Sequence, residues 1–182
     1  MKVISGILKG RNIKGYDIEG TRPTMDRVKE SIFSTIQNEI KDSIVLDLFC
    51  GSGNLGIEAI SNGCKLCYFI DNNPKAINVV NENINNFNIK DKSKVLNFDY
   101  KKSIKYFSER NIKFDVILAD PPYDYHIIEK ILTLIDKYDI LNDNGIVVVE
   151  FEKEKLDNSY GKLNLIKDKK YGWRYVYIYK KC

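Results

Sequence analysis

The chain has 182 residues, of which 43% are hydrophobic and 30% are charged, a composition typical of one folded domain with a substantial core. No apolar run approaches the roughly 20 residues that a membrane-spanning helix needs, and residues 1–6 lead into no signal-peptide core. We therefore expect a cytoplasmic, monomeric protein with no membrane partner.

The net charge of +4 is distributed unevenly along the chain. Residues 1–15 carry four cations and no acid, and residues 162–182 carry seven cations and one acid, Asp168. The segment between these ends is therefore acidic overall. Basic ends indicate contact with a polyanion, and an acidic body suits a cationic cofactor. The alternative is that the lysines are simply solvated.

The first predicted elements are two short strands, residues 2–5 and 11–14, which form a hairpin. This segment reads as too polar to belong to a core. We therefore divide the chain into an N-terminal hairpin appendage, residues 1–20, and a main domain, residues 21–182.

A helix is predicted to open near Thr24, which can cap it. Arg22, Arg27 and Lys29 cluster at its start, where they either hold phosphates or stay solvated. Four apolar residues recur at helical spacing and predict that one face packs on a sheet: Val28, Ile32, Ile36 and Ile40.

The next apolar run breaks into three closely spaced glycines, Gly51, Gly53 and Gly56. Their spacing fits the glycine fingerprint of nucleotide-binding α/β folds, in which a buried strand ends in a tight turn and a helix begins. A second buried strand follows and ends before Asp71, whose carboxylate can accept both hydroxyls of a ribose.

These features fit both a nicotinamide dinucleotide and S-adenosylmethionine. Asp47 separates the two, because an anion just before the glycine turn would repel a pyrophosphate but pair with the amino group of a methionine moiety. We therefore expect S-adenosylmethionine as the cofactor. Cys50 lies inside the turn, where we expect it to pack beside the cofactor.

Two further strands end in polar residues. The third, residues 94–98, precedes Asp99, which either accepts the amine of an adenine or caps the next helix. The fourth, residues 114–119, leads to the segment Asp120–Tyr123, of sequence Asp-Pro-Pro-Tyr. Two prolines fix φ and remove backbone donors, so this turn presents its carbonyls in one arrangement. Its acid and its aromatic ring suit a planar amine.

Five strands alternate with helices, and residues 163–166 and 175–179 follow as an antiparallel pair. This order predicts a three-layer α/β sandwich with a mostly parallel, seven-stranded sheet whose last strand is antiparallel. Cys64 and Cys67 have the spacing of half a metal site, but no second pair exists and one histidine is present. We expect packed free thiols and no metal.

The turn motifs together resemble the class I S-adenosylmethionine-dependent amino-methyltransferases. Further segments are similar to the RsmD family, bacterial enzymes that methylate the N2 amine of a guanine in 16S ribosomal RNA: Ser5-Gly6, Lys9-Gly10-Arg11, Thr21–Thr24, Asp26–Val28 and Tyr171-Gly172. The resemblance covers nearly the whole chain and implies a Rossmann-like class I methyltransferase fold over residues 21–182. The chain departs from the pattern of this family at Met25, Cys50 and Trp173-Arg174. Only the last pair bears on contacts with the substrate.

The resemblance and the turn chemistry assign three groups of residues. Cofactor binding is assigned to Asp47, Phe49, Gly51, Gly53, Gly56, Asp71, Asn72, Asp99 and Tyr100. Catalysis is assigned to Asp120, Pro121, Pro122 and Tyr123. Substrate binding is assigned to Lys9, Arg11, Arg22 and Tyr123.

The reaction implied by the resemblance is direct displacement, in which the guanine amine attacks the sulfonium methyl group of S-adenosylmethionine. Asp120 and the Pro121 carbonyl would accept hydrogen bonds from the amine, and Tyr123 would stack on a flipped base. The implied partner is 16S rRNA or an assembly intermediate of the small ribosomal subunit. The alternatives are a DNA adenine-N6 methyltransferase, a nicotinamide enzyme and a non-catalytic nucleotide-binding protein.

Overall fold

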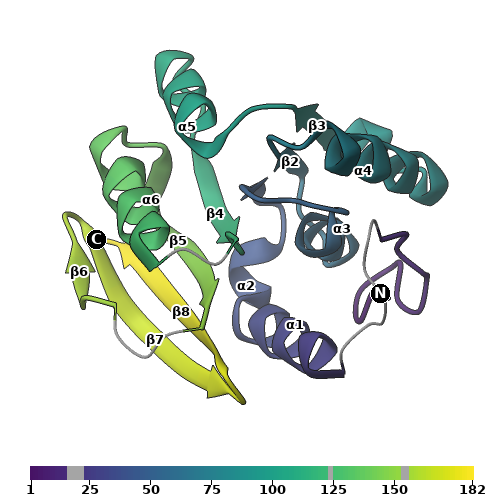
Figure 1. The fold of residues 1–182 in the computed structure, drawn as a ribbon, viewed down its shortest axis with the longest axis horizontal. Coiled ribbons are helices and arrows are strands. Elements are labelled where there is room, and N and C mark those ends of the chain that lie inside the picture. Colours follow the sequence, from purple (N-terminus) through teal and green to yellow (C-terminus); the bar gives the residue numbers. More distant parts are fainter. Residues whose placement is uncertain (16–22, 123–124, 153–155) are drawn as a thin grey trace.

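One eight-stranded sheet organises the protein, with the strand order β3-β2-β1-β4-β5-β8-β7-β6 (Figure 1). The computed structural model describes residues 1–15, 23–122, 125–152 and 156–182. The strands are β1 (Ile44–Asp47), β2 (Leu66–Ile70), β3 (Ser93–Leu96), β4 (Phe114–Ala119), β5 (Leu141–Phe151), β6 (Ser159–Tyr160), β7 (Leu163–Tyr171) and β8 (Arg174–Lys181). The helices are α1 (Pro23–Thr35), α2 (Gln37–Ile40), α3 (Asn54–Ser61), α4 (Pro74–Phe87), α5 (Tyr100–Glu109), α6 (Tyr125–Lys137) and the 3-10 helix η1 (Lys90–Lys92).

The first five strands pair in parallel, and β8 inserts antiparallel between β5 and β7. The predicted α/β architecture and its closing antiparallel pair are therefore confirmed. The predicted number of seven strands is wrong, because β6 adds an eighth by pairing with β7. This strand has two residues, too few to leave a periodic pattern in a sequence.

Helices cover both faces of the sheet and make three layers (Figure 1). Apolar residues of α1–α4 form one core with Val45 and Val148, and those of α5 and α6 form a second core with Leu46 and Val149. Neighbouring strand residues thus point to opposite cores, as they do in a sheet buried on both faces. None of the helices in the described ranges is long and apolar enough to cross a bilayer.

The first predicted helix is two helices. Its apolar stripe is buried as expected, but α1 ends at Thr35 and α2 begins at Gln37. Thr24 is not the cap, because α1 already begins at Pro23. Proline suits the first position of a helix, since its φ is pre-set and its missing N–H would have no partner there.

The N-terminal segment pairs as a hairpin, but with one antiparallel bridge, Lys2↔Asn12, in place of two strands. The expectation that it is too polar for the core is wrong. Val3, Leu8 and Ile13 are buried in the core that contains α1–α4. These three apolar residues anchor a segment whose average composition is polar. The average composition therefore did not predict that the segment contributes to the core.

Candidate active site

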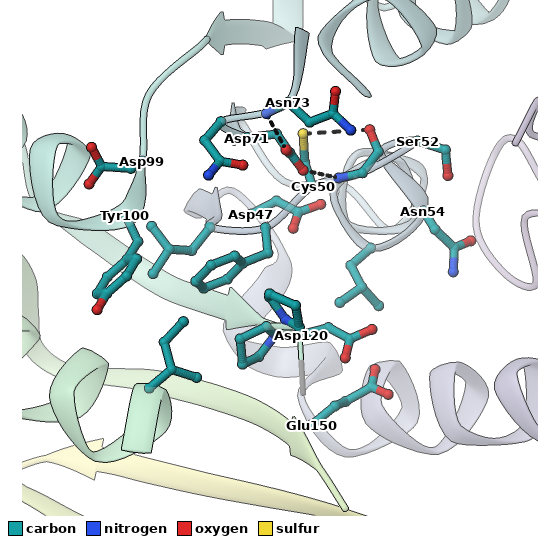
Figure 2. A pocket seen from close by; sticks show the side chains of 18 of the residues that line it. Asp47, Cys50, Ser52, Asn54, Asp71, Asn73, Asp99, Tyr100, Asp120 and Glu150 are labelled. Atoms are coloured by element: carbon teal, nitrogen blue, oxygen red, sulfur yellow. Dashed lines mark hydrogen bonds between the residues drawn. The ribbon is translucent and has the colours of Figure 1, made fainter. Parts of the chain in front are cut away.

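The parallel strands deliver acidic side chains to one edge of the sheet. Ligands of open α/β sheets bind outside the carboxyl ends of the strands, and here five strands each have an acid within three residues of that end. These acids line a single cavity of about 520 Å³ (Figure 2): Asp47, Asp71, Asp99, Asp120 and Glu150. Two cations, Lys29 and Arg174, line the same cavity. An acidic cavity of this size favours a cationic ligand.

The glycine turn joins β1 to α3 on one side of this cavity. Gly51 lines the cavity, whereas Gly53 and Gly56 are absent from its lining. Gly53 has φ +86° just before α3, and a Cβ on Gly56 would lie 2.3 Å from a ring carbon of Phe69. These two glycines therefore allow the turn and the close packing of α3 on β2.

Asp47 is a buried carboxylate with one oxygen left for a ligand. The Gly56 N–H donates to its Oδ2 at 2.8 Å, while Oδ1 has no hydrogen-bond partner among the described residues. Burial raises the pKa of Asp47 to about 7, and the charges of Asp120 and Asp71 add to this effect. An orphaned buried acceptor is costly, so a cationic donor in the cavity would stabilise it.

Asp71 holds the glycine turn against the end of β2. Its Oδ2 accepts the Gly51 N–H at 3.0 Å, and its Oδ1 accepts the Asn73 N–H at 2.8 Å. Asn72, a predicted cofactor residue, also lines the cavity. The carboxylate is therefore fixed at the place where the sequence predicted a ribose contact.

Asp99 caps α5, as one of its two predicted roles required. Its Oδ1 accepts the N–H groups of Lys101 and Lys102 at 2.9 and 3.0 Å. The side chain also lines the cavity, next to an apolar wall in which the rings of Phe49 and Tyr100 lie 5.8 Å apart. This wall and the nearby carboxylate suit a planar ring that carries an amine.

Asp120 lies across the cavity from the glycine turn, followed by Pro121 and Pro122, which also line it (Figure 2). Arg174 Nη1 lies 3.7 Å from Asp120 Oδ2 and 3.0 Å from Glu150 Oε2. Burial raises the pKa of Asp120, and Arg174 opposes this rise. Burial likewise raises the pKa of Glu150, to about 8. One guanidinium thus holds two carboxylates at the cavity wall.

Glu150 and Arg174 were not predicted as site residues. β8 runs opposite to β5, with Glu150 paired to Val176 and Phe151 to Tyr175. The first residue of β8 therefore meets the carboxyl end of β5. Antiparallel pairing can therefore bring a cation from a later part of the chain to the edge of the sheet where ligands bind. The closing antiparallel pair that the sequence predicts is the one feature that could have pointed to Arg174.

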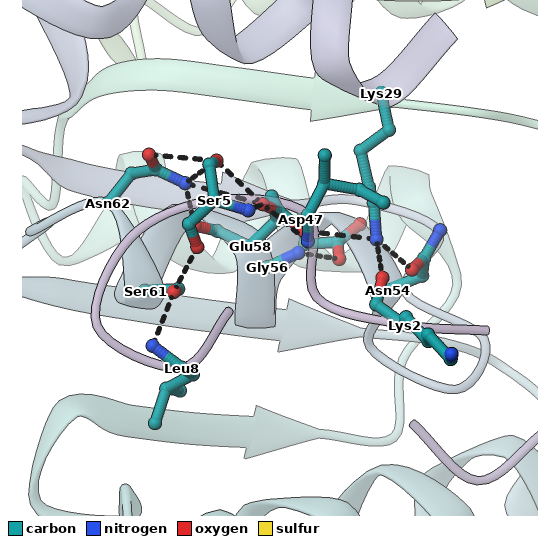
Figure 3. A network of polar contacts seen from close by, with 11 residues as sticks. Lys2, Ser5, Leu8, Lys29, Asp47, Asn54, Gly56, Glu58, Ser61 and Asn62 are labelled. Atoms are coloured by element: carbon teal, nitrogen blue, oxygen red, sulfur yellow. Dashed lines mark hydrogen bonds and ion pairs between the residues drawn. The ribbon is translucent and has the colours of Figure 1, made fainter. Parts of the chain in front are cut away.

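Lys29 was also not predicted as a residue of this cavity, and the alternative that it is a solvated charge is wrong. The residue as a whole is 1% exposed. Its Nζ lies 3.0 Å from Glu58 Oε2 and donates to Asn54 Oδ1 at 2.8 Å and to the Lys2 carbonyl at 2.5 Å (Figure 3). Glu58 in turn accepts the N–H groups of Ile4 at 2.9 Å and Ser5 at 2.8 Å. This network ties the N-terminal segment to α1 and α3 behind the cavity.

The predicted substrate residues lie outside the cavity or outside the described residues. Lys9 is exposed. The guanidinium of Arg11 lies 4.4 Å from the centre of the Phe87 ring and donates to the Asn86 carbonyl at 2.6 Å, at the end of α4. Arg22 and Tyr123 belong to the segments that the structure does not describe.

Three of the four cysteines are packed thiols, and Cys182 is exposed. Cys64 and Cys67 are buried and free, as predicted. Cys50 is buried beside the cavity, and burial raises its pKa well above its ordinary value. A thiol that resists ionisation is a poor nucleophile, so the surroundings of Cys50 favour a packing role over covalent chemistry.

Comparison with known proteins gives the family. Residues 1–180 match the family described as Conserved hypothetical protein 95. The chain is 40% identical over 182 residues to the provisionally named rRNA methyltransferase YlbH of Bacillus subtilis, covering 100% of this chain and 99% of that protein. It is 32% identical over 156 residues to Ribosomal RNA small subunit methyltransferase D of Haemophilus influenzae, covering 85% and 80% of the two chains.

A solved structure gives the same answer for the fold. The Escherichia coli protein yhhF, provisionally named a methyltransferase, superimposes with a TM-score of 0.88 at 26% identity and covers 100% of this chain and 97% of that one. The family match, the relatives and the shared fold agree with the acidic cavity at the carboxyl ends of the strands. The chain therefore belongs to the Conserved hypothetical protein 95 family, as an RsmD-type methyltransferase.

Proposed function

We propose that this enzyme transfers a methyl group from S-adenosylmethionine to the exocyclic N2 amine of a guanine in 16S rRNA. The observation that carries the proposal is that Asp47 and the Asp120 turn line opposite parts of one cavity. A cationic methyl donor and an amine acceptor would therefore meet in one place. The names of the relatives from B. subtilis and H. influenzae support RNA as the substrate.

The residues present fit S-adenosylmethionine. The free Oδ1 of Asp47 would accept from its ammonium group, Asp71 would take its ribose, and Asp99 with the Phe49–Tyr100 wall would take its adenine. A dinucleotide would instead place a pyrophosphate beside the buried carboxylate of Asp47, while the two described cations of the cavity, Lys29 and Arg174, already pair with acids. When bound, S-adenosylmethionine supplies an electrophilic methyl group on a positively charged sulfur.

On the acceptor side, the chain orients a weak nucleophile. Asp120 would accept a hydrogen bond from the N2 amine and the Pro121 carbonyl a second, which favours the pyramidal nitrogen of the transition state over the conjugated ground state. Holding the reacting groups in this orientation can lower the activation free energy by up to roughly 7–11 kcal/mol. No strong base is then required, because the proton leaves the nitrogen only after methylation, and the Asp120 carboxylate would accept it. We propose that Tyr123 stacks on the guanine after it has swung out of its RNA strand.

The proposal is tested with the methyl-labelled cofactor and three acceptors: naked 16S rRNA, assembled small ribosomal subunits and double-stranded DNA. We expect label in one of the two RNA samples, recovered as N2-methylguanosine after digestion to nucleosides. The control is Asp120→Ala, which should transfer less label in the same time, by roughly 100-fold or more. Label recovered from DNA as N6-methyladenine would replace the proposal with the DNA alternative, and no label with any acceptor would favour a binding protein.

A further inference from the structure

The turn between β7 and β8 presents an exposed aromatic side chain beside the active site. The two strands pair up to Tyr171↔Arg174, which leaves Gly172 and Trp173 as a two-residue turn. Gly172 has a φ of 62°, a value that glycine adopts readily at the start of such hairpin turns. Trp173 is 44% exposed. A short, well-paired hairpin thus holds a large ring out into solvent.

Arg174 connects this ring to the proposed catalytic carboxylate. Its guanidinium lies 5.1 Å from the centre of the Trp173 ring, and its Nη1 lies 3.7 Å from Asp120 Oδ2. A guanidinium over an indole face is a favourable cation–π contact, and the ion pairs with Asp120 and Glu150 fix its other side. The Arg174 side chain therefore lies between Trp173 and Asp120, where the acceptor amine is proposed to bind.

β7 adds positive charge in the strand that leads into this turn, where Lys169 and Lys170 lie over the rings of Tyr171 and Tyr175. Lys167, Lys169 and Lys170 are exposed on this strand, with Asp168 among them. Proteins that bind single-stranded nucleic acid combine cations along the backbone path with aromatic rings on which bases stack. The β7 lysines followed by Trp173 have this combination, which fits a polyanion with unpaired bases better than an apolar partner.

We propose that Trp173 stacks on an unpaired RNA base next to the target guanine. This inference rests on the proposed function, since it takes RNA as the substrate. A stacked neighbour would hold the strand in place while the target base enters the cavity, and RNA recognition commonly uses bases splayed out in single-stranded loops.

The sole tryptophan of the chain makes a direct test possible. Its emission, excited where tyrosine does not absorb, reports on position 173 alone. The probe is a single-stranded 16S rRNA fragment that contains the unmodified target guanine. It should quench this emission when added to the complete protein with S-adenosylhomocysteine. A fully paired duplex of the same sequence should not. Unchanged emission with the single strand would overturn the proposal.

Substitutions give the second arm of the test. Trp173→Ala should raise the KM for RNA roughly tenfold or more while leaving kcat and cofactor affinity near their wild-type values, and Trp173→Phe should restore most of the loss. The matched control is Ile166→Ala, since Ile166 is a second large apolar side chain exposed on β7, at 56%. An equal effect from both alanine variants, or none from Trp173→Ala, contradicts stacking.

The two proposals fail in different ways. Quenching by RNA without methyl transfer would contradict the proposed function and leave the stacking contact in place. Methyl transfer to guanine without quenching would contradict the stacking contact alone.

Discussion

In the proposed reaction, the acceptor half depends on Asp120. We expect Asp120→Ala to lower the rate of methyl transfer roughly 100- to 1,000-fold, because the charge-stabilising acceptor at the amine is lost. The cofactor affinity should stay near the wild-type value, since Asp47 and Asp71 belong to the other side of the cavity. Single-turnover kinetics and calorimetry with the cofactor measure the two effects separately. Parallel loss of both would contradict the role of Asp120.

Four of the five acids that line the cavity were predicted from the sequence, and one was not. Asp47, Asp71, Asp99 and Asp120 each end or follow a strand whose apolar run is visible locally. Glu150 lies inside the eleven-residue β5, so no turn signal marks it.

The two cations of the cavity could not be predicted for a related reason. Lys29 is buried by partners on α3 and on the N-terminal segment, and Arg174 reaches the cavity through the antiparallel register of β8. Both depend on contacts between segments far apart in the chain, which local patterns do not contain.

Among the elements, α3 carries the ion pair that holds the N-terminal segment. Glu58→Gln would leave Lys29 charged and unpaired in a site where its side chain is 2% exposed. We expect a loss of about 3–5 kcal/mol in the free energy of unfolding, because removing one partner of a buried pair strands the other. Denaturant unfolding measures this loss.

The matched control for that substitution is Glu109→Gln. Glu109 pairs with Lys105 one turn away on the surface of α5, at 3.7 Å, and exposed pairs of this kind contribute about 0.5 kcal/mol or less. Equal losses from the two variants would mean that the Lys29–Glu58 pair does not anchor the segment.

At the scale of the whole molecule, the buried charge of Asp47 links stability to pH. Its pKa is raised by burial from 3.8 to about 7 in the folded protein. Between these two pH values, the folded state therefore binds more protons than the unfolded state. The stability that this group contributes is therefore present below about pH 4 and is lost as the pH rises through 7.

Asp47→Asn should remove this dependence. We expect thermal unfolding of the ligand-free wild type to occur at progressively lower temperature than that of the variant as the pH rises from 5 to 8, at constant ionic strength. The cofactor should stabilise the wild type more at pH 8 than at pH 5, because its cation favours the ionised carboxylate. A constant difference between the two proteins across this range would contradict the linkage.

The basic N-terminal segment gives a prediction about substrate binding. If exposed Lys9 contacts an RNA phosphate, Lys9→Gln should reduce the slope of log affinity against log salt by about 0.7, the value for one phosphate contact on a single strand. Filter binding of RNA at several salt concentrations measures the slope. Lys113→Gln is the control, because Lys113 precedes β4, at the amino end of a strand whose carboxyl end faces the cavity. Identical slopes for the two variants would leave Lys9 as a solvated charge.

The position of β8 between β5 and β7 has a consequence for how the protein is made. The ribosome synthesises β7 before β8, yet β7 and β6 are connected to the rest of the sheet only through β8. A nascent chain can thus close the five parallel strands and the glycine turn first, while the strand that carries Arg174 is still missing. Prematurely terminated chains would keep the donor half of the cavity and lack the guanidinium beside Asp120. The strand that joins β7 and β6 to the sheet therefore also supplies the guanidinium beside Asp120.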